Sequence, residues 1–224
     1  MAKAGKLSKN LLDELSHETR KRPFGNLPSR RYYLIVCEGK KTEPNYFEAI
    51  KRALPPEMVK RITISGTGNN TLSLVEYAQR EVLARQRSGC PPYYKIWVVF
   101  DHDSFNDDDF DNAISMISQK STKTEHWQSA WSNEAFELWY ILHFRNQAGG
   151  ALSRHEYECI LEDEMKRPYK KNAEDMFELL KPHVVDAIKR ANVALKLQNG
   201  KPYHAQNPAT TVHLLVKELL SYIP

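Results

Sequence analysis

Cysteines are few in this sequence, and their spacing excludes two common structural roles. The 224 residues include only Cys37, Cys90 and Cys159, which are far apart and odd in number, and no Cys-x-x-Cys pair occurs. Disulfide frameworks and cysteine-based zinc sites need paired, closely spaced cysteines. We therefore expect a protein of a reducing compartment, the cytoplasm.

Long apolar runs and two well-known catalytic motifs are also missing. No stretch approaches the roughly 20 apolar residues of a membrane span, and no apolar run follows the N-terminal lysines, so we expect neither a membrane protein nor a secretory signal. The sequence lacks the Gly-x-x-x-x-Gly-Lys-Ser/Thr motif of P-loop NTPases. It also lacks an elbow motif that would indicate a Ser-His-Asp hydrolase.

The composition is that of a globular protein with a mild positive charge. Hydrophobic residues make up 41% and charged residues 27%, so a packed core is expected over most of the chain. The net charge of +4 permits an anionic partner such as nucleic acid without requiring one. Residues 1–30 are locally basic and interrupted by Pro23, Gly25 and Pro28. We interpret them as a flexible basic arm, with either a phosphate contact or a poorly ordered terminus as its role.

Short β-rich runs alternate with amphipathic segments over the first two thirds of the chain. The strand-like runs lie at 32–37, 61–65, 94–100 and 125–132. The helical segments between and after them lie at about 42–54, 71–88, 110–118 and 134–144, with Thr42, Thr71 and Asn133 as expected N-caps. This alternation predicts an α/β fold, in which a mostly parallel sheet is flanked by helices.

Beyond Gly149 the periodicity is helical only. The segments lie at about 153–165, 172–197 with a break near Pro182, and 209–222. We therefore expect three parts: the basic arm over 1–30, an α/β domain over 31–145, and a helical C-terminal region over 146–224 that packs on that domain.

Acidic side chains directly follow two of the strand-like runs. Glu38 comes after the first, and Asp101 and Asp103 come after the third. Ligands of open parallel sheets bind beyond the carboxyl ends of the strands, near a switch in strand order. If these strands are neighbours, and if the chain leaves the third strand in an extended conformation, the three carboxylates converge. Because converging carboxylates repel unless a cation neutralises them, and oxygen ligands suit Mg²⁺ or Mn²⁺, we predict a divalent-metal site. A polar loop is the alternative for Asp-x-Asp alone.

Two lysines beside the first acid are candidate phosphate contacts. Lys40 and Lys41 follow Glu38-Gly39, and the helix that begins near Thr42 adds N–H donors at its N-terminus. A solvated basic turn is the alternative reading of these lysines.

Further candidate substrate contacts lie later in the chain. Asn133 and Glu137 are four residues apart and would share one helical face, either as an edge of the active site or as a cap and an ion pair. Lys170 and Lys171 belong to a basic cluster around Tyr169, which either follows a nucleic-acid backbone or forms a solvated helix end.

The acids after the strands also carry a resemblance to known proteins. Glu38-Gly39 and Asp101-x-Asp103 resemble the Toprim domain of topoisomerases, primases and OLD-family nucleases. The longer string Ile35-Val-Cys-Glu-Gly-Lys-Lys-Thr-Glu-Pro-Asn-Tyr-Phe47 resembles the RloB family, a Toprim-like group of bacterial and archaeal defence loci. Further similar segments are Phe100-Asp-His-Asp-Ser-Phe105, Ser132-Asn-Glu-Ala-Phe-Glu-Leu-Trp139 and Asn207-Pro-Ala-Thr-Thr-Val-His213.

The resemblance implies a nuclease that depends on Mg²⁺ or Mn²⁺. Glu38 would be a metal ligand or general acid/base, and Asp101 and Asp103 would be the metal-binding pair. Many Toprim proteins have an aspartate shortly after the Glu-Gly, where this chain offers Glu43. Glu137 belongs to the family pattern and is a further catalytic candidate.

The resemblance also implies a biological setting. The substrate would be RNA, including tRNA, or DNA. The protein would act in anti-phage defence and abortive infection under the control of an ABC-type or AAA-type ATPase partner. A homo-oligomer is compatible with this role. The alternative is a non-catalytic module that binds nucleic acid or a nucleotide, or that docks on the ATPase.

Overall fold

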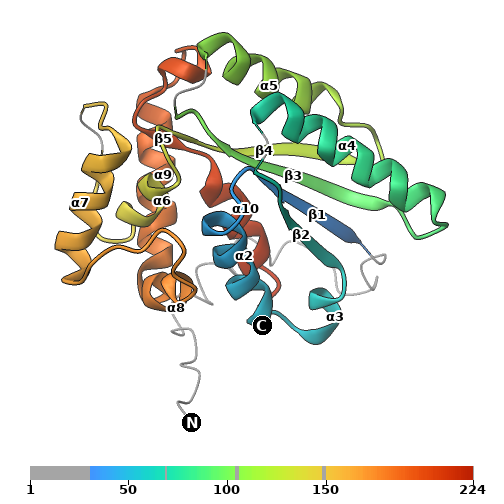
Figure 1. Cartoon of the computed structure of the whole chain (residues 1–224), viewed down its shortest axis with the longest axis horizontal. Coiled ribbons are helices and arrows are strands. Elements are labelled where there is room, and N and C mark those ends of the chain that lie inside the picture. The colour runs from blue at the N-terminus through green and yellow to red at the C-terminus, as the bar shows by residue number, and fades with distance from the viewer. Residues whose placement is uncertain (1–30, 69, 104–105, 148–149, 224) are drawn as a thin grey trace.

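A computed structural model describes residues 31–68, 70–103, 106–147 and 150–223 of the chain. The basic arm predicted for residues 1–30 lies outside the described residues. One five-stranded sheet is flanked by helices on both faces (Figure 1). The predicted α/β class, with a mostly parallel sheet and a helical C-terminal region, is confirmed. Among the described residues, no helix has the length and apolar character needed to cross a membrane.

The sheet has the strand order β2-β1-β3-β4-β5. Its strands are β1 (Tyr32–Cys37), β2 (Ile62–Gly66), β3 (Tyr93–Asp101), β4 (His126–Asn133) and β5 (Ala209–Thr210). The pairs β1–β2, β1–β3 and β3–β4 are parallel, and β5 runs antiparallel to β4. The four predicted strands are confirmed to within one residue at each end, whereas β5 is too short for its pattern to be recognised in the sequence.

The helices agree in most places with the predicted periodicity, including the break near Pro182, and differ in the places described below. They are α2 (Thr42–Arg52), α3 (Pro56–Val59), α4 (Thr71–Arg87), α5 (Asp107–Gln119), α6 (Glu137–Ile141), α7 (Arg154–Met165), α8 (Met176–Leu180), α9 (Val184–Leu197) and α10 (Val212–Leu220), with 3₁₀ turns at Lys181–His183 and Tyr203–Ala205. The helix expected over 134–144 is only the short α6. The break near Pro182 is a 3₁₀ turn, and the segment expected over 209–222 starts as β5 before α10 begins.

The starts of α4 and α5 are among those that differ from the sequence prediction. The N-cap of α4 is Asn70 rather than Thr71, because the Asn70 side chain accepts a hydrogen bond from the Ser73 backbone N–H. The helix expected from about residue 110 begins at Asp107, so the acidic stretch 107–109 forms the first turn of α5 behind the N-cap Asn106. Acidic residues are favoured there by the partial positive charge of a helix N-terminus.

The sheet separates two apolar cores because successive strand side chains point to opposite faces. On β1, Leu34 and Val36 pack with α4 and α5 on one face. Ile35 and its neighbours Tyr33 and Cys37 pack on the other face with α2, α6, α9 and α10. This second core also contains buried residues of α7 and α8, so the sheet and the C-terminal helices share one core.

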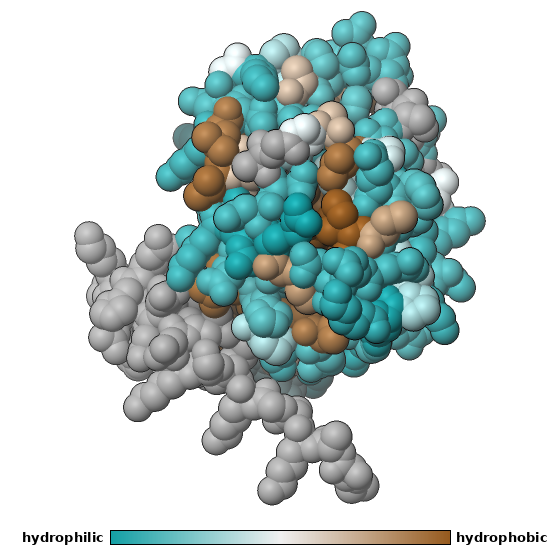
Figure 2. Space-filling view, turned by 90° about the vertical axis from the view of Figure 1, so that its left-hand side faces the viewer, coloured by the Kyte–Doolittle hydropathy of each residue, from teal (hydrophilic) through white to brown (hydrophobic). Residues whose placement is uncertain are grey.

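The outward surface of the C-terminal helices is polar. The side of the molecule that carries α7 and α8 is largely hydrophilic, with separate small hydrophobic spots (Figure 2). Helix α7 buries Tyr157 and Leu161 and leaves most of its acidic side chains exposed. The buried apolar residues of these helices therefore belong to the shared core.

Candidate functional site

The carboxyl ends of β1 and β3 lie side by side, which is the condition for the predicted convergence of acids. The backbone N–H of Glu38 donates to the carbonyl oxygen of Val99 at 2.9 Å, so the residue after β1 is held beside β3. The Glu38 carboxylate in turn accepts a hydrogen bond from the backbone N–H of Asp101 at 3.2 Å. One carboxylate from each strand is thereby fixed at the same edge of the sheet.

A pocket of about 420 Å³ lies at this edge. It brings together the five predicted carboxylates and three of the predicted lysines, namely Glu38, Glu43, Asp101, Asp103, Glu137, Lys40, Lys41 and Lys171. Residues that sequence reasoning did not single out as part of the site complete its lining, among them Thr42, Arg154 and Asn172. Asn133 and Lys170 are not in it.

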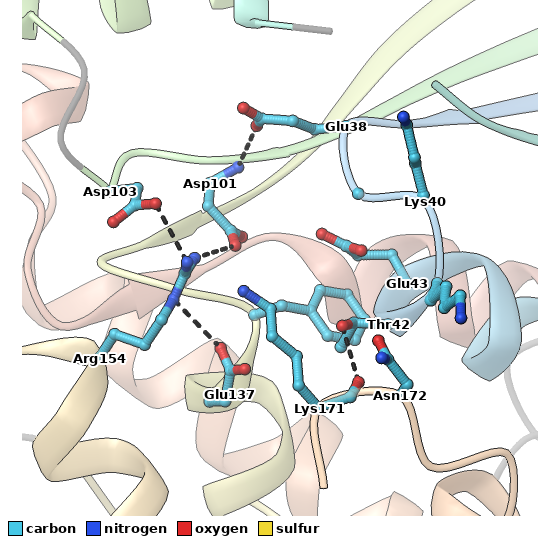
Figure 3. A pocket seen from close by; sticks show the side chains of 13 residues that line it. Glu38, Lys40, Thr42, Glu43, Asp101, Asp103, Glu137, Arg154, Lys171 and Asn172 are labelled. Carbon is cyan, nitrogen blue, oxygen red and sulfur yellow. Dashed lines mark hydrogen bonds and ion pairs between the residues drawn. The ribbon is translucent and has the colours of Figure 1, made fainter. Parts of the chain in front are cut away.

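Arg154 is the main feature of the pocket that sequence reasoning missed. Its guanidinium lies among the acids (Figure 3), with Nη2 3.2 Å from Asp101 Oδ2 and Nη1 3.1 Å from Asp103 Oδ2. Nε lies 3.8 Å from Glu137 Oε2. Arg154 is the first residue of α7, directly after the N-cap Ser153. No local pattern distinguishes an arginine at that position from a solvent-exposed one, so only the tertiary fold reveals it.

Glu43 explains why glycine follows Glu38. Glu43 is buried in the first turn of α2, and its carboxylate packs against the Gly39 backbone. A Cβ at Gly39 would lie 2.1 Å from Glu43 Oε2, far inside van der Waals contact. The Glu43 carboxylate therefore leaves no room for a side chain at position 39.

The loop that contains Gly66 and Gly68 packs against the turn after β1 and supports it. The backbone N–H of Gly68 donates to the Glu38 carbonyl oxygen at 2.7 Å. A Cβ at Gly66 would lie 2.7 Å from the Gly39 carbonyl oxygen, so the two loops pack backbone against backbone. The short Gly-x-Gly sequence thus has a structural role in holding Glu38 in place.

Asp103 reaches the pocket by a turn, so the expected extended exit from β3 is wrong. Its φ of 41° places it in the left-handed region, which aspartate enters more readily than most residues. Its backbone N–H donates to the Glu134 carbonyl oxygen at 2.9 Å, which ties the turn to the segment after β4. The Asp103 carboxylate is thereby aimed at Arg154.

Burial and mutual repulsion raise the pKa of three pocket acids. Burial, with the nearby Glu43 and Asp103 carboxylates, raises the pKa of Glu38 to about 7. The pKa of Asp101 is raised well above its usual range by burial and then by Glu43 and Glu137. Burial and Glu137 also raise the pKa of Glu43. For these three acids, burial and the neighbouring carboxylates outweigh the opposing effect of Arg154 on the pKa.

The loop before α8 closes the pocket from the C-terminal region. The Thr42 hydroxyl donates to the Lys171 carbonyl oxygen at 2.8 Å. Thr42 is the first residue of α2, whose N-cap is Lys41, so the predicted cap is wrong. The Tyr169 hydroxyl donates to Glu137 Oε1 at 2.8 Å. The Lys171 side chain points into the centre of the pocket (Figure 3). The site is thus built from both the sheet and the C-terminal helices.

Three predicted substrate contacts lie elsewhere or point elsewhere. Asn133 ends β4, is fully buried, and donates through Nδ2 to the His204 carbonyl oxygen at 2.5 Å, so the helical face expected to join it to Glu137 does not form. Lys170 is exposed and lines a separate hollow beside Arg167. Lys40 lines the pocket, but its side chain extends away from the acids (Figure 3).

The oxygen-rich lining fits the chemistry of a hard divalent cation. Asp101 Oδ1 and Glu43 Oε2 are buried and have no hydrogen-bond partner among the described residues, and carboxylate oxygens are what Mg²⁺ and Mn²⁺ prefer. The side-chain positions are nonetheless not those of a loaded metal site. Within the described part of the chain, no three His, Cys, Asp or Glu side chains are placed to hold a metal ion. Two of the predicted ligands contact Arg154 instead.

Fold and pocket together define an α/β protein with an acidic site where the strand order switches between β1 and β3. The chain belongs to the RloB-like protein family, whose model matches residues 33–219. The match includes every residue that lines the pocket, from Glu38 to Asn172. No curated protein and no solved structure matches the chain.

Proposed function

We propose that this protein is a metal-dependent nuclease that hydrolyses phosphodiester bonds of RNA or DNA. The observation that carries the proposal is the pocket at the strand-order switch, where five carboxylates and several lysines from distant parts of the chain meet. Such a combination suits a cation and a phosphate side by side. Membership of the RloB-like family, and the resemblance of the Glu-Gly and Asp-x-Asp motifs to Toprim enzymes, support the same reading.

Six of the residues that line the pocket have a role in this proposal. Glu38, Asp101 and Asp103 would hold Mg²⁺ or Mn²⁺, which when bound polarises a phosphoryl oxygen and stabilises the leaving oxygen. Lys171, which points into the pocket, binds the substrate phosphate. As the alternative to metal ligation, Glu38 would act as a general acid/base, because burial raises its pKa to about 7. Glu43 and Glu137 are buried in the same pocket and are the further catalytic candidates.

The biological setting in the proposal rests on the family resemblance. RloB-like proteins resemble effectors of anti-phage defence that an ABC-type ATPase controls. We therefore propose a cytoplasmic role for this chain beside such a partner.

The test compares wild type with Asp101→Asn on tRNA, single-stranded RNA and plasmid DNA, each with Mg²⁺, Mn²⁺ or EDTA. We expect cleavage by wild type, loss in EDTA, and a drop of at least about a hundredfold in the variant, which corresponds to about 2.7 kcal/mol of barrier. Asp163→Asn is the matched control, because Asp163 is exposed on α7 and pairs with Lys166 at the surface, outside the pocket. Equal cleavage by Asp101→Asn and wild type would rule out this site.

A second candidate, a non-catalytic binding module, has one observation in its favour. Asp101 and Asp103 are paired with Arg154, and no three metal-ligand side chains are gathered in the described residues. A module of this kind binds nucleic acid or a nucleotide through the lysines without turnover. Retention of RNA or DNA on wild-type protein, with no cleavage in any metal and with ATPase partner present, would favour it.

A further inference from the structure

The guanidinium of Arg154 stands where the predicted metal ligands would otherwise face one another. It contacts Asp101 Oδ2 at 3.2 Å and Asp103 Oδ2 at 3.1 Å from one side chain. We propose that Arg154 is an intramolecular competitor of the divalent cation: metal binds only as the guanidinium leaves the two aspartates, so this arginine sets the metal affinity of the pocket. The inference rests on the proposed metal site, but not on cleavage.

Distances make simultaneous occupation by both cations unfavourable. A Mg²⁺ ion sits about 2.1 Å from each carboxylate oxygen and demands near-octahedral geometry. Arg154 occupies these same two oxygens, Asp101 Oδ2 at 3.2 Å and Asp103 Oδ2 at 3.1 Å, so an ion bound to both would compete with the guanidinium for them. Two cations in contact in a largely buried pocket also repel strongly. Binding of the ion consequently requires the arginine to move.

Charge balance explains why the arginine lies among the acids. The pocket holds five carboxylates, and their attraction raises the pKa of Arg154 although burial opposes the charged form. Arg154 is therefore a permanent positive charge that partly offsets the repulsion among Asp101, Asp103 and Glu137. A divalent ion offsets the same repulsion with twice the charge, so the two states use one set of acids.

The local structure allows the exchange without unfolding. Arg154 is the first residue of α7, and its side chain is 26% exposed, whereas that of Asp101 is 8% exposed. The helix start is held independently by a capping box, in which Ser153 and Glu156 bond each other's backbone N–H groups. Only side-chain torsions of Arg154 need to change for the guanidinium to turn toward solvent, while the acids stay on their strands.

The experiment measures Mn²⁺ binding by electron paramagnetic resonance, with no nucleic acid present. Wild type is compared with Arg154→Gln, Arg154→Lys, Asp101→Asn and the matched control Arg167→Gln, because Arg167 pairs with Asp175 outside the pocket. We expect Arg154→Gln to bind Mn²⁺ about 5- to 150-fold more tightly than wild type, the usual range for coupling between two binding events. The Mn²⁺ affinity of Arg154→Lys should lie between those of wild type and Arg154→Gln. The affinity of Arg167→Gln should equal that of wild type, and Asp101→Asn should bind Mn²⁺ more weakly than wild type.

The outcomes separate this inference from the proposed function. Equal or weaker Mn²⁺ binding by Arg154→Gln overturns the competition, as does wild-type affinity in Asp101→Asn. If Arg154→Gln fails to fold, as judged by circular dichroism, the test uses Arg154→Lys instead. A Mn²⁺ affinity of Arg154→Lys equal to that of wild type then overturns the inference. Tighter binding in the arginine variants supports it even if no RNA or DNA is cut, in which case only the nuclease proposal fails. Absence of Mn²⁺ binding in every variant overturns both.

Discussion

The first turn of α5 and the carboxylate pocket both collect acidic side chains, but under opposite physical conditions. In α5, Asp107, Asp108 and Asp109 are consecutive, largely exposed, and placed at a helix N-terminus whose partial charge favours them. In the pocket the acids come from different elements, and Asp101 and Glu137 are buried. There burial and repulsion work against ionisation, as the raised pKa of Asp101 reflects.

The comparison shows that local density of acids is a poor guide to a site. The three consecutive aspartates of α5 complete a helix start behind the cap Asn106, and Asp107 also lies 3.0 Å from His102 Nε2. The scattered pocket acids cost folding free energy unless a cation accompanies them. A protein retains such an arrangement where the cost serves binding or chemistry, which is why the pocket, and not α5, carries the functional proposal.

The largest expected effect on this contrast comes from removing the positive charge of Arg154 from the pocket. Arg154→Gln leaves Asp101, Asp103 and Glu137 without the guanidinium that contacts them. We expect the metal-free variant to lose about 3 kcal/mol of unfolding free energy near neutral pH, because breaking a buried charge cluster leaves uncompensated charge. Urea denaturation in EDTA measures the loss.

Two further measurements show whether charge is the cause of that loss. Acidification should shrink it, because the uncompensated carboxylates then take up protons. Added Mn²⁺ should restore more stability to Arg154→Gln than to wild type. A variant as stable as wild type near neutral pH would mean that the ion pairs of Arg154 contribute nothing, and the contrast with α5 would lose its basis.

A smaller effect comes from Glu38, whose pKa burial raises from 4.5 to about 7. The folded protein therefore holds this proton more tightly than the unfolded chain, and stability present below the unfolded pKa is lost as the pH rises through the folded one. Glu38→Gln lacks this loss. We expect the metal-free variant to gain about 2 kcal/mol over wild type between about pH 5 and about pH 8, a value reduced for solvent screening of a partly exposed side chain.

The difference between the two proteins is the informative quantity in that experiment. His143 and His213 are buried with a lowered pKa, so they make any wild-type profile rise with pH over the acidic range. They are the same in Glu38→Gln, and their contribution cancels on subtraction. A difference that stays constant from about pH 5 to about pH 8 would show that Glu38 is not destabilised by its surroundings.

Much of the fold could be predicted from the sequence because it depends on local patterns. The runs that became β1 and β3 are almost entirely apolar, as strands buried on both faces must be. Their ends placed Glu38 and Asp101 at one edge once the strands were taken as neighbours. The helix N-caps were less predictable, because neighbouring Asn70 and Thr71 are both good capping residues and only the backbone geometry decides between them.

The rest of the site depends on contacts that no local pattern encodes. Arg154 is separated from Asp101 by 53 residues and meets it only because α7 packs beside α6. Asn133 fits an N-cap by residue type, yet the chain stays extended to the end of β4 and buries it against the carbonyl of His204. The two-residue β5 forms because Thr210 pairs with Ser132 across the chain, which periodicity in so short a segment does not reveal.

The smallest expected effect tests the α5 side of the comparison. Asp108 is exposed in the first turn of α5, so Asp108→Asn removes a charge that the helix N-terminus favours. We expect a loss of about 0.3–1 kcal/mol at low salt, and a smaller loss at high salt because exposed charges are screened. The sign is opposite to that of Glu38→Gln near pH 8, although both changes replace a carboxylate by its amide. Urea denaturation of both variants at the same pH and salt makes the comparison. If both variants shifted stability in the same direction, acids of the helix start and acids of the pocket would not differ in the way that burial and the helix dipole require.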